Sequence, residues 1–562
     1  MTTENAQNAG LRCTNVSKVP PCDDYLRGAL PKIVNPVSSV SVYLNATTGS
    51  DANGGGSSGS PVQTLSRALE LLEFSSAETA VIEITSATLA LGANPVIDLF
   101  PLAARYGKIV FRGPRTQLAS DIVASTATFG PTMIGINGTT GGYTIGAFAK
   151  KYTINNTSLY DTRMANLTNT ATNISTLVTS QSNLFFQGDT NLAWTAGDTY
   201  QVFDISTIVS WTGSLRIKIA PYNRVIFDSL ILRPGADAHF TISPKPSNEY
   251  LVHFRSCQVE SVGTAGVFTY LGNYIMEGCY CVSALASNRV LNYGKLFMVN
   301  SFVERVSLNI QINEGVVCAT HILNSEATGG IAVESTQAFL AGISTSGGAG
   351  APVISVSTSS NARILNVEQT AAAAIPIRIR RSIAEISGAT ATVVAGATNT
   401  LSITEGSSVV ISSVTTTDVG NVAAGVLIAA SKVSINLMVV SGSSTHGVTI
   451  NNGSVVSVTG TLTSGNALGA GILVDQGSKL SGSATSTISG TGSTSVGMSV
   501  VGGSSGAFAV RPTVTGTAGN AFVGNAPGPQ AAQTWAVIAN RVPGQCNDFA
   551  VNPTQNCYIF TA

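Results

Sequence analysis

The sequence has little charge, and it has no long apolar run. Asp, Glu, Lys and Arg make up 10% of its 562 residues, against about 25% in ordinary globular chains. The 29 basic residues equal the 29 acidic ones, so the electrostatic attraction to nucleic acid and to anionic membranes is missing. No stretch reaches the ~18 apolar residues of a membrane-spanning helix, and residues 1–30 contain no recognisable secretory signal. We therefore expect neither nucleic-acid binding nor membrane insertion.

Histidine is rare, and the common catalytic motifs are missing from the sequence. It contains no GxSxG or HExxH motif, no P-loop, and no GxGxxG between a strand and a helix. The four histidines lie far apart, at His239, His253, His321 and His446. We expect His253 and His321, which lie beside apolar strands, to be partly buried, and His446, in a Ser/Thr turn, to be solvated.

The eight cysteines fall into three groups. Two pairs lie near the ends of the chain, Cys13 with Cys22 and Cys546 with Cys557. Each terminal pair either forms a disulfide in an oxidising setting or remains as free loop thiols. The middle group is Cys257, Cys279, Cys281 and Cys318. None of the cysteines has the CxxC spacing of a zinc site, and we expect no metal and no cofactor.

What the sequence does contain is a tandem repeat of short apolar strands. The repeated pairs are Ile331/Val333, Ile354/Val356, Ile377/Ile379, Leu401/Ile403, Val426/Ile428, Val448/Ile450, Ile472/Val474, Met498/Val500 and Ala521/Val523. Successive copies are 22 to 26 residues apart, and no helical pattern lies between them. A period of this size built from strands alone indicates a solenoid whose coils stack, with equivalent residues in one inward column.

A polar turn with a serine follows most copies of the repeated strand. These serines are Ser382, Ser407, Ser431, Ser454, Ser478 and Ser504. A second alternating strand often comes next, as in residues 432–435 and 454–458. Each coil is therefore predicted to contain more than one strand.

The N-terminal part predicts a cap for the solenoid. Residues 40–44 alternate as a strand, and a Gly/Ser/Asn loop follows over 47–60. Leu65, Ala68, Leu69 and Leu72 then repeat with helical spacing, with Thr64 near the N-cap. A short amphipathic helix here would cover the open apolar end of the first coil, and residues 80–84 and 108–112 would form the first coils.

This N-terminal stretch resembles the first segment of pectate-lyase-like right-handed parallel β-helix proteins. The resemblance rests on residues 42–44 (VYL), 49–51 (GSD), 60–61 (SP), 64–65 (TL) and 68–69 (AL). That family includes bacterial pectate lyases and many phage and giant-virus surface proteins. The resemblance implies an all-β, right-handed parallel β-helix, and it leaves activity open because the family contains both enzymes and structural shafts.

The predicted organisation has five parts. An N-terminal arm spans residues 1–40, and the start of the β-helix with its capping helix spans 41–115. A small β-rich insertion, Thr/Asn-rich and containing Trp194 and Trp211, spans 116–222. The β-helix shaft spans 223–525, and a C-terminal cap or assembly segment spans 526–562.

A second register in the earlier coils supplies the candidate site. After successive apolar strands come Asp228-Ser229, Arg255-Ser256, Glu277-Gly278, Asn300-Ser301 and Asn324-Ser325. Under the family resemblance, Asp228, Arg255 and Glu277 are the catalytic candidates, because those enzymes hold Ca²⁺ with acidic residues and remove a proton with a basic one. The alternative is a stacked column that alternates sign to avoid like-charge repulsion, which the sequence favours. Cys257 and Cys279 share a similar register, either as stacked core thiols or as an inter-coil disulfide.

The later repeats lack a paired-acid site along one column. Glu405 and Asp475 follow strands three coils apart, about 14 Å, whereas glycoside hydrolysis needs two carboxyl groups about 5–9.5 Å apart. Arg381 and Glu405 lie on adjacent coils, and we expect them to form an exposed ion pair.

The sequence leaves three functions open. The first is a non-enzymatic structural or surface protein on the virion, such as a capsid spike, fibre or appendage. Its expected partners are copies of itself in a homotrimer, other virion proteins, or a host surface glycan in attachment. The second is an extracellular polysaccharide lyase or glycoside hydrolase of the pectate-lyase-like or tailspike type, with Ca²⁺ only in this case. The third is an adhesin or glycan-binding module without turnover. The sequence favours the first.

Overall fold

A computed structural model gives the fold of the chain. It describes residues 39–75, 77–103, 105–129, 133–138, 148–152, 158–165, 183–187, 199–220, 223–235, 239–243, 251–261, 267–271, 274–283, 289–292, 296–299, 302–304, 307–311, 316–325, 331–335, 337–346, 354–371, 375–393, 399–418, 424–442, 445–467, 469–492, 497–500, 504–508, 513–516, 522–524, 535–537 and 559–560. Side chains are described within 39–116, 204–235, 252–259, 274–279 and most of 331–508. Residues 1–38 of the predicted arm and the cysteines Cys13, Cys22, Cys546 and Cys557 lie outside the described residues, and the last two residues of the arm belong to the first strand.

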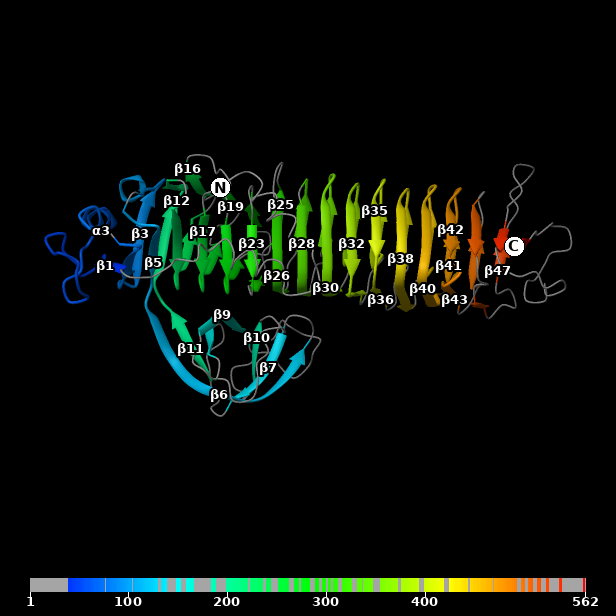
Figure 1. Ribbon diagram of the computed structural model, residues 1–562, viewed down its shortest axis with the longest axis horizontal. Helices are drawn as coiled ribbons and strands as arrows, with labels where there is room; N and C mark the ends of the chain where they lie inside the picture. The colour runs from blue at the N-terminus through cyan, green and yellow to red at the C-terminus, as the bar shows by residue number, and fades with distance from the viewer. Residues whose placement is uncertain are drawn as a thin grey trace. The chain divides into compact units, whose positions relative to one another are not determined.

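The chain forms two compact units. The first comprises Met1–Ala327 and Ala341–Ser344, and the second comprises Thr328–Leu340 and Thr345–Ala562. One strand, β28 (Gln337–Ser346), has residues in both. Each unit contains parallel strands stacked in columns (Figure 1), which confirms the predicted parallel β-helix. Within the described residues, no helix is long and apolar enough to cross a membrane.

Three columns of parallel strands form the coils of the first unit. The first column is β1 (Ser39–Leu44), β2 (Thr79–Ile84), β5 (Lys108–Arg112), β14 (Arg224–Asp228), β17 (Leu251–Arg255), β20 (Tyr274–Glu277), β23 (Leu296–Val299) and the start of β26 (Val316–Ser325). The second is β3 (Thr88–Ala93), β12 (Ile208–Thr212), β15 (Ile231–Pro234), β18 (Gln258–Ser261), β21 (Tyr280–Ser283), β24 (Phe302–Glu304) and the end of β26. The third is β4 (Val96–Asp98), β13 (Ser214–Lys218), β16 (His239–Ser243), β19 (Val267–Leu271), β22 (Arg289–Asn292) and β25 (Ser307–Gln311).

The core of this unit contains an aromatic stack that runs across the coils. Phe111 and Phe227 stack with ring centroids 5.1 Å apart, and Phe227 and Phe254 at 5.4 Å. Tyr274 continues the series 5.9 Å from Phe254. Phe111, Phe227 and Phe254 occupy the same inward position of successive strands, whereas Tyr274 pairs with Val252 and Met276 lies opposite Phe254. One aromatic ring per coil still packs on the next.

The predicted capping helix is present at the start of the chain. It is α3 (Leu65–Leu72), with Thr64 as N-cap, whose hydroxyl accepts a hydrogen bond from the Arg67 N–H. Asp51 fixes this cap, because its carboxylate accepts from the backbone N–H groups of Gln63 and Thr64 and from the Thr64 hydroxyl, all at 2.9 Å. A short 3₁₀ turn, η1 (Phe100–Leu102), follows β4.

The inserted region is a closed antiparallel barrel. It consists of β6 (Arg115–Phe129), β7 (Met133–Gly138), β8 (Phe148–Tyr152), β9 (Ser158–Ala165), β10 (Asn183–Gln187) and β11 (Thr199–Ile205). The coil resumes at β12, which pairs with β3, and at β13, which pairs with β4. This is earlier than the boundary at residue 222 predicted from sequence. Trp211, assigned there to the insertion, lies instead in the coil and is buried, because the Thr/Asn-rich composition does not mark where pairing resumes.

The second unit repeats the three-column plan over the tandem repeat. Its first column is β27 (Ile331–Glu334), β29 (Ile354–Ser357), β31 (Ile377–Arg380), β34 (Leu401–Thr404), β37 (Val426–Ala429), β39 (Val448–Asn451), β41 (Ile472–Val474), β44 (Met498–Val500) and β47 (Phe522–Gly524). Ile377, Leu401, Val426 and Val448 are directly paired and fully buried. The predicted inward column is thus confirmed.

The last predicted member of that column is wrong by one residue. Met498 pairs with Phe522 and Val500 with Gly524, not with Ala521 and Val523. A shift of one residue exchanges the two faces of a strand. The larger apolar residue, Phe522, therefore takes the column position in this strand.

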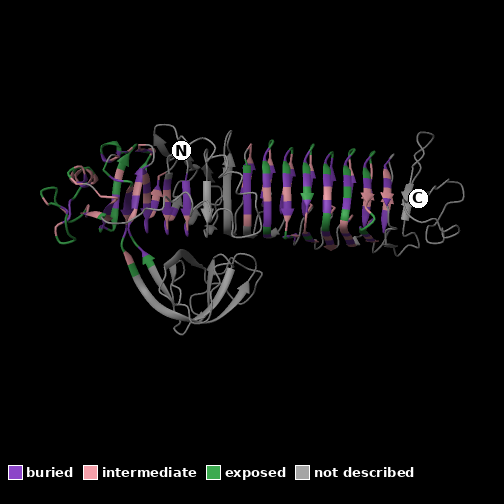
Figure 2. Ribbon diagram, in the orientation of Figure 1, coloured by how far each residue is buried: buried purple, intermediate pink, exposed green. Residues whose placement is uncertain are grey.

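The other two columns of the second unit follow the serine turns. The second is the start of β30 (Asn361–Ala371), then β32 (Ile383–Ser387), β35 (Ser408–Ile411), the start of β38 (Lys432–Gly442), the start of β40 (Val455–Ala467), β42 (Lys479–Gly482), β45 (Ser505–Phe508), β48 (Trp535–Val537) and β49 (Ile559–Phe560). The third is the end of β30, β33 (Ala389–Val393), β36 (Val414–Asp418), the ends of β38 and β40, β43 (Thr487–Gly492) and β46 (Thr513–Gly516). Where the side chains of these strands are described, buried residues alternate with intermediate or exposed ones along most of their length (Figure 2).

The predicted turn serines form a buried column between coils. They are all at most 6% exposed, and Ser360 belongs to the same set. The backbone N–H of one serine donates to the hydroxyl oxygen of the serine one coil further along in the pairs Ser360–Ser382, Ser382–Ser407, Ser431–Ser454, Ser454–Ser478 and Ser478–Ser504. Several of these serines follow a residue with positive φ. Arg381, directly before Ser382, has a φ of 49°, and Asn452, two residues before Ser454, has a φ of 57°. The serines therefore satisfy backbone groups that the tight turns would otherwise leave buried and unpaired.

Candidate functional site

Five charged residues of the first unit lie in register and alternate in sign. They are Glu83 on β2, Arg112 on β5, Asp228 on β14, Arg255 on β17 and Glu277 on β20. We call these five residues the charged ladder. The structure thus brings together the three predicted candidates, Asp228, Arg255 and Glu277. It adds Arg112 and Glu83 from the coils that precede the barrel in sequence.

The continuation of this column predicted from sequence is wrong. Glu277 pairs with Val299, and Val299 pairs with Thr320. Asn324 lies instead in the neighbouring column, opposite Val303, and Asn300 lies outside the described residues. The Asn-Ser pairs follow Glu277 at the same residue spacing that separates the ladder residues, which is why the sequence suggested that they continue the column. The strand pairing instead continues the column with Val299 and Thr320.

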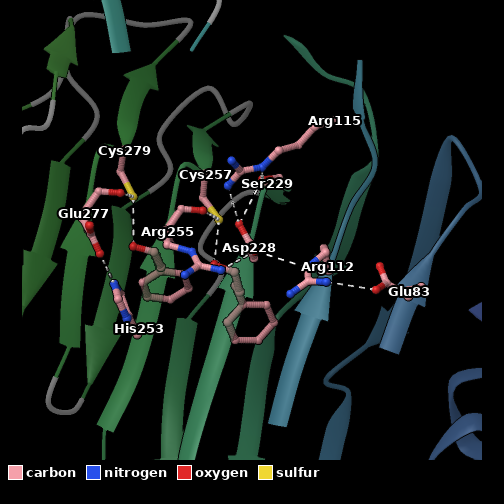
Figure 3. Close-up of polar contacts among 12 residues, drawn as sticks. Glu83, Arg112, Arg115, Asp228, Ser229, His253, Arg255, Cys257, Glu277 and Cys279 are labelled. Atoms are coloured by element: carbon pink, nitrogen blue, oxygen red, sulfur yellow. Dashed lines mark hydrogen bonds and ion pairs between the residues drawn. The ribbon is translucent and has the colours of Figure 1, made fainter. Parts of the chain in front are cut away.

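Asp228 is the most enclosed member of the charged ladder. Its carboxylate contacts three guanidinium groups: Arg255 Nη2 at 2.6 Å, Arg115 Nη2 at 2.9 Å and Arg112 Nε at 3.3 Å. The Ser229 hydroxyl donates to Asp228 Oδ1 at 2.9 Å. The Asp228 side chain is only 3% exposed, so these contacts replace water around both of its oxygens (Figure 3).

The surroundings shift the pKa of two ladder carboxyls in opposite directions. Burial favours the neutral form of Asp228, but the charges and hydrogen bonds of Arg255 and Arg115 outweigh it and hold the pKa well below its usual range. Burial raises the pKa of Glu83, and its contact with Arg112 only partly offsets this rise. Asp228 is therefore a permanent anion at ordinary pH, which makes it unfit as a general acid or base.

His253 joins the end of the ladder. It lies two residues before Arg255 on the same strand, and its Nε2 is 3.0 Å from Glu277 Oε2. The His253 and Glu277 side chains are 12% and 13% exposed, so the prediction of a partly buried His253 is confirmed. The described residues give no side-chain account of His321 or His239.

The ladder does not fit a calcium site of the kind implied by the family resemblance. Ca²⁺ takes six to eight oxygen ligands, whereas guanidinium groups occupy the Asp228 oxygens and Arg255 separates Asp228 from Glu277 along the column. Across the described residues, His, Cys, Asp and Glu form no group of three or more able to hold a metal ion. The arrangement joins neighbouring coils through alternating charges, as the favoured alternative predicts.

Two cysteines lie beneath the ladder. Cys257 and Cys279 are free and fully buried. The Cys257 thiol lies 3.3 Å from the Phe227 carbonyl oxygen, and the Cys279 thiol lies 3.4 Å from that of Phe254. Each thiol thus contacts the preceding coil in the same way, and burial raises the pKa of Cys257 to about 12. They are stacked core thiols, the first of the two predicted alternatives.

The remaining candidates lie in the second unit. Glu405 contacts Arg381 Nε at 2.8 Å, as predicted, and also Arg380 Nε at 2.6 Å. The prediction that His446 is solvated is wrong. It is partly buried, burial lowers its pKa, and its Nδ1 accepts a hydrogen bond from the Ala470 N–H at 3.1 Å. The turn packs against the next coil, which its polar sequence does not reveal.

The sequence did contain a signal for Arg112, one of the two missed ladder residues. Residues 108–113 (KIVFRG) resemble 224–229 (RVIFDS) and 251–256 (LVHFRS): a phenylalanine precedes the charged residue, and glycine or serine follows it. Aligning these segments places Arg112 beside Asp228. The barrel between them hides this relation, since it separates the two by 116 residues in the chain.

We compared the chain with known protein families, curated proteins and solved structures. No family model matches the sequence, and no curated protein matches it. Among solved structures, the chain is similar to the Gp54 tailspike of Acinetobacter baumannii bacteriophage AP22, solved in complex with A. baumannii capsular saccharide. The identity is 10%, the TM-score is 0.26, and the match covers 72% of this chain and 71% of that one. A TM-score this low supports no inference about this chain.

Proposed function

We propose that the chain is a non-enzymatic structural or surface protein of a virus particle, a spike, fibre or appendage that acts in assembly or attachment to the host. The observation that carries this proposal is the state of Asp228. The best-placed carboxylate of the candidate column is buried, permanently charged and bonded to three arginines. Its contacts hold coils together rather than leaving a reactive oxygen for a substrate.

The second unit supports the same proposal. Its inward column of apolar residues pairs without interruption from β27 to β47, and buried serines join successive turns. Eight steps of about 4.8 Å give this column a length of about 38 Å. A long, regular and nearly uncharged stack is suited to a rigid spacer.

The proposed partners follow from the surface of the second unit. Ile383 on β32, Val410 on β35 and Val455 on β40 are 59%, 50% and 43% exposed along the second column, in which β38 separates β35 from β40. Charged residues lie beside these side chains, Glu385 opposite Val410 and both Lys432 and Lys479 opposite Val455. The exposed apolar side chains between them tolerate burial against copies of the chain, and we propose a homotrimer. Other virion proteins or a host surface glycan are the proposed further partners. Sedimentation at micromolar concentration tests the assembly, and a monomer contradicts it.

The experiment for the function is direct detection in particles. Antibody labelling and mass spectrometry of purified virions should find the chain at the particle surface, in a fixed ratio to the major capsid protein. Its restriction to the unassembled fraction of infected cells contradicts the proposal.

A parallel assay tests the enzymatic alternative. Neutral and uronate-containing polysaccharides, with and without Ca²⁺, should yield neither unsaturated product nor new reducing ends. If turnover appears and the Glu277→Ala variant abolishes it, the lyase or hydrolase alternative replaces the proposal. Binding to a polysaccharide without turnover favours a glycan-binding role.

A further inference from the structure

Both connections between the barrel and the coil meet one turn of the first unit, residues 228–231. The barrel begins with Arg115 on β6 and ends with Ile205 on β11. These two residues are direct partners in the β6–β11 ladder. The base of the barrel is therefore a pair of strands joined to each other where they leave the coil.

The first connection is held by the backbone and by an ion pair. The Gly113 N–H donates to the Asp228 carbonyl oxygen at 2.9 Å. A Cβ on Gly113 would collide with the Ser229 carbonyl oxygen, so only glycine allows the chain to pass this close. Two residues later, Arg115 Nη2 contacts Asp228 Oδ1 at 2.9 Å, and Arg115 Nε donates to the Ser229 hydroxyl at 2.6 Å.

The second connection is held by apolar packing and by the backbone. Ile205 is 5% exposed, and Ile231 packs against it. Thr207 follows, fully buried, and its hydroxyl donates to the Ser86 carbonyl oxygen at 2.9 Å. The Ile231 N–H donates to the Thr207 carbonyl oxygen at 2.9 Å. The same turn therefore holds the strand that leaves the coil and the strand that returns to it.

We propose that residues 228–231 form a clamp that fixes how the barrel is presented on the first unit, with Asp228, Ser229 and Arg115 as its positioning residues. A strand pair bound on both sides to one turn cannot pivot without breaking these contacts. The clamp makes the barrel a rigidly presented module. It also gives Asp228 a role beyond the coils, because one carboxylate binds Arg112 and Arg255 of the coil together with Arg115 of the barrel.

The electrostatics are consistent with a clamp that stays closed. The pKa of Asp228 is held below its usual range, so mild acid does not neutralise the carboxylate. Burial also limits screening by salt. The clamp is a fixed device under these conditions, not a pH switch.

The test compares two arginines that bind the same carboxylate. Hydrogen–deuterium exchange is measured on the full chain and on the variants Arg115→Gln and Arg112→Gln. Arg115→Gln should speed exchange at residues 113–116 and 204–207 about tenfold, as expected when a charge-assisted hydrogen bond is lost at a local opening. Exchange at residues 79–84 of β2 should remain unchanged. Arg112→Gln, which acts within the coil, should speed exchange at 79–84 and spare 204–207.

Two further variants separate the clamp from general folding. Arg115→Lys keeps the charge but loses the forked contact, and should restore part of the protection. Ser229→Gly removes the hydroxyl that Arg115 contacts, and glycine suits the φ of 60° at this position. Ser229→Gly should also speed hydrogen exchange at residues 113–116, by less than Arg115→Gln does. If Arg115→Gln and Ser229→Gly leave both connections as protected as in the wild type while β2 remains folded, the clamp does not exist.

Discussion

Arg255 on β17 lies directly opposite Asp228 on β14, and its Nη2 is 2.6 Å from Asp228 Oδ2. The two residues are 27 positions apart in sequence and occupy equivalent places in adjacent coils. This contact shows how the solenoid turns a repeat in sequence into a column of neighbours. It also decides the interpretation of the candidate site, because the same oxygen atoms cannot serve both the arginines and a substrate.

Replacing Asp228 by asparagine should destabilise the first unit strongly. Asp228→Asn removes the buried counter-charge that Arg112, Arg115 and Arg255 share, and these side chains are themselves 39%, 24% and 36% exposed. Losing charge-assisted hydrogen bonds of this kind costs about 2 kcal/mol. Denaturant unfolding followed by hydrogen exchange at β14 and β17 measures the loss. The matched control is Asp98→Asn, which removes the exposed pair with Lys218 at 3.2 Å and should cost less than about 1 kcal/mol. Equal effects of the two variants contradict the assigned role.

The contribution of Asp228 should depend on pH in one direction. Its folded pKa is depressed, so its stabilisation is fully present above the unfolded pKa of about 3.9 and is lost as pH falls toward the folded value. The difference in unfolding free energy between the wild type and Asp228→Asn should be flat from about pH 5 to 8 and shrink below about pH 4. A difference that begins to shrink near neutrality is incompatible with this pKa.

Much of the fold could be predicted from the sequence because one residue pattern repeats in every coil. Local residue spacing was sufficient to predict the apolar column through Ile377 and Leu401, the serine turns, and the N-cap at Thr64. The register at Phe522 could not be predicted in this way. Ala521, Phe522 and Val523 are all apolar, so alternation alone does not say which of them points inward.

The candidate site was only partly predictable, for a physical reason. Asp228, Arg255 and Glu277 lie on successive coils of similar length, and counting residues finds them. Arg112 lies just before the inserted barrel and Arg115 is the first residue of its first strand, so they precede Asp228 by 116 and 113 residues. A regular spacing between coils cannot be counted across an insertion of unknown length. Where the ladder ends could not be predicted either, because a one-residue difference in strand register decides it. Val299, and not Asn300, lies opposite Glu277.

The serine column gives a prediction for the second unit. Ser454 is fully buried, its hydroxyl donates to the Asn451 carbonyl oxygen at 2.6 Å, and it accepts from the Ser431 N–H at 3.2 Å. Ser454→Ala leaves that N–H buried without this acceptor and should cost about 1–3 kcal/mol. The matched control is Ser457→Ala, an exposed serine of the same coil, which should change the free energy of unfolding by less than about 0.5 kcal/mol. Thermal and denaturant unfolding of both variants test the pair.

The buried thiols give a prediction about reactivity. With a pKa of about 12, Cys257 is thiolate in only about one molecule in ten thousand at pH 8, and burial denies reagents access to it. Iodoacetamide should therefore leave Cys257 and Cys279 unmodified in the native protein for hours, as followed by peptide mass spectrometry. Both should react within minutes after denaturation, which is the internal control. Rapid labelling of either cysteine in the native protein would mean that the coils at the charged ladder open readily. Asp228→Asn should increase the labelling rate of Cys257, because it removes the Arg255–Asp228 contact between β17 and β14, and the Cys257 thiol lies 3.3 Å from the Phe227 carbonyl oxygen of β14.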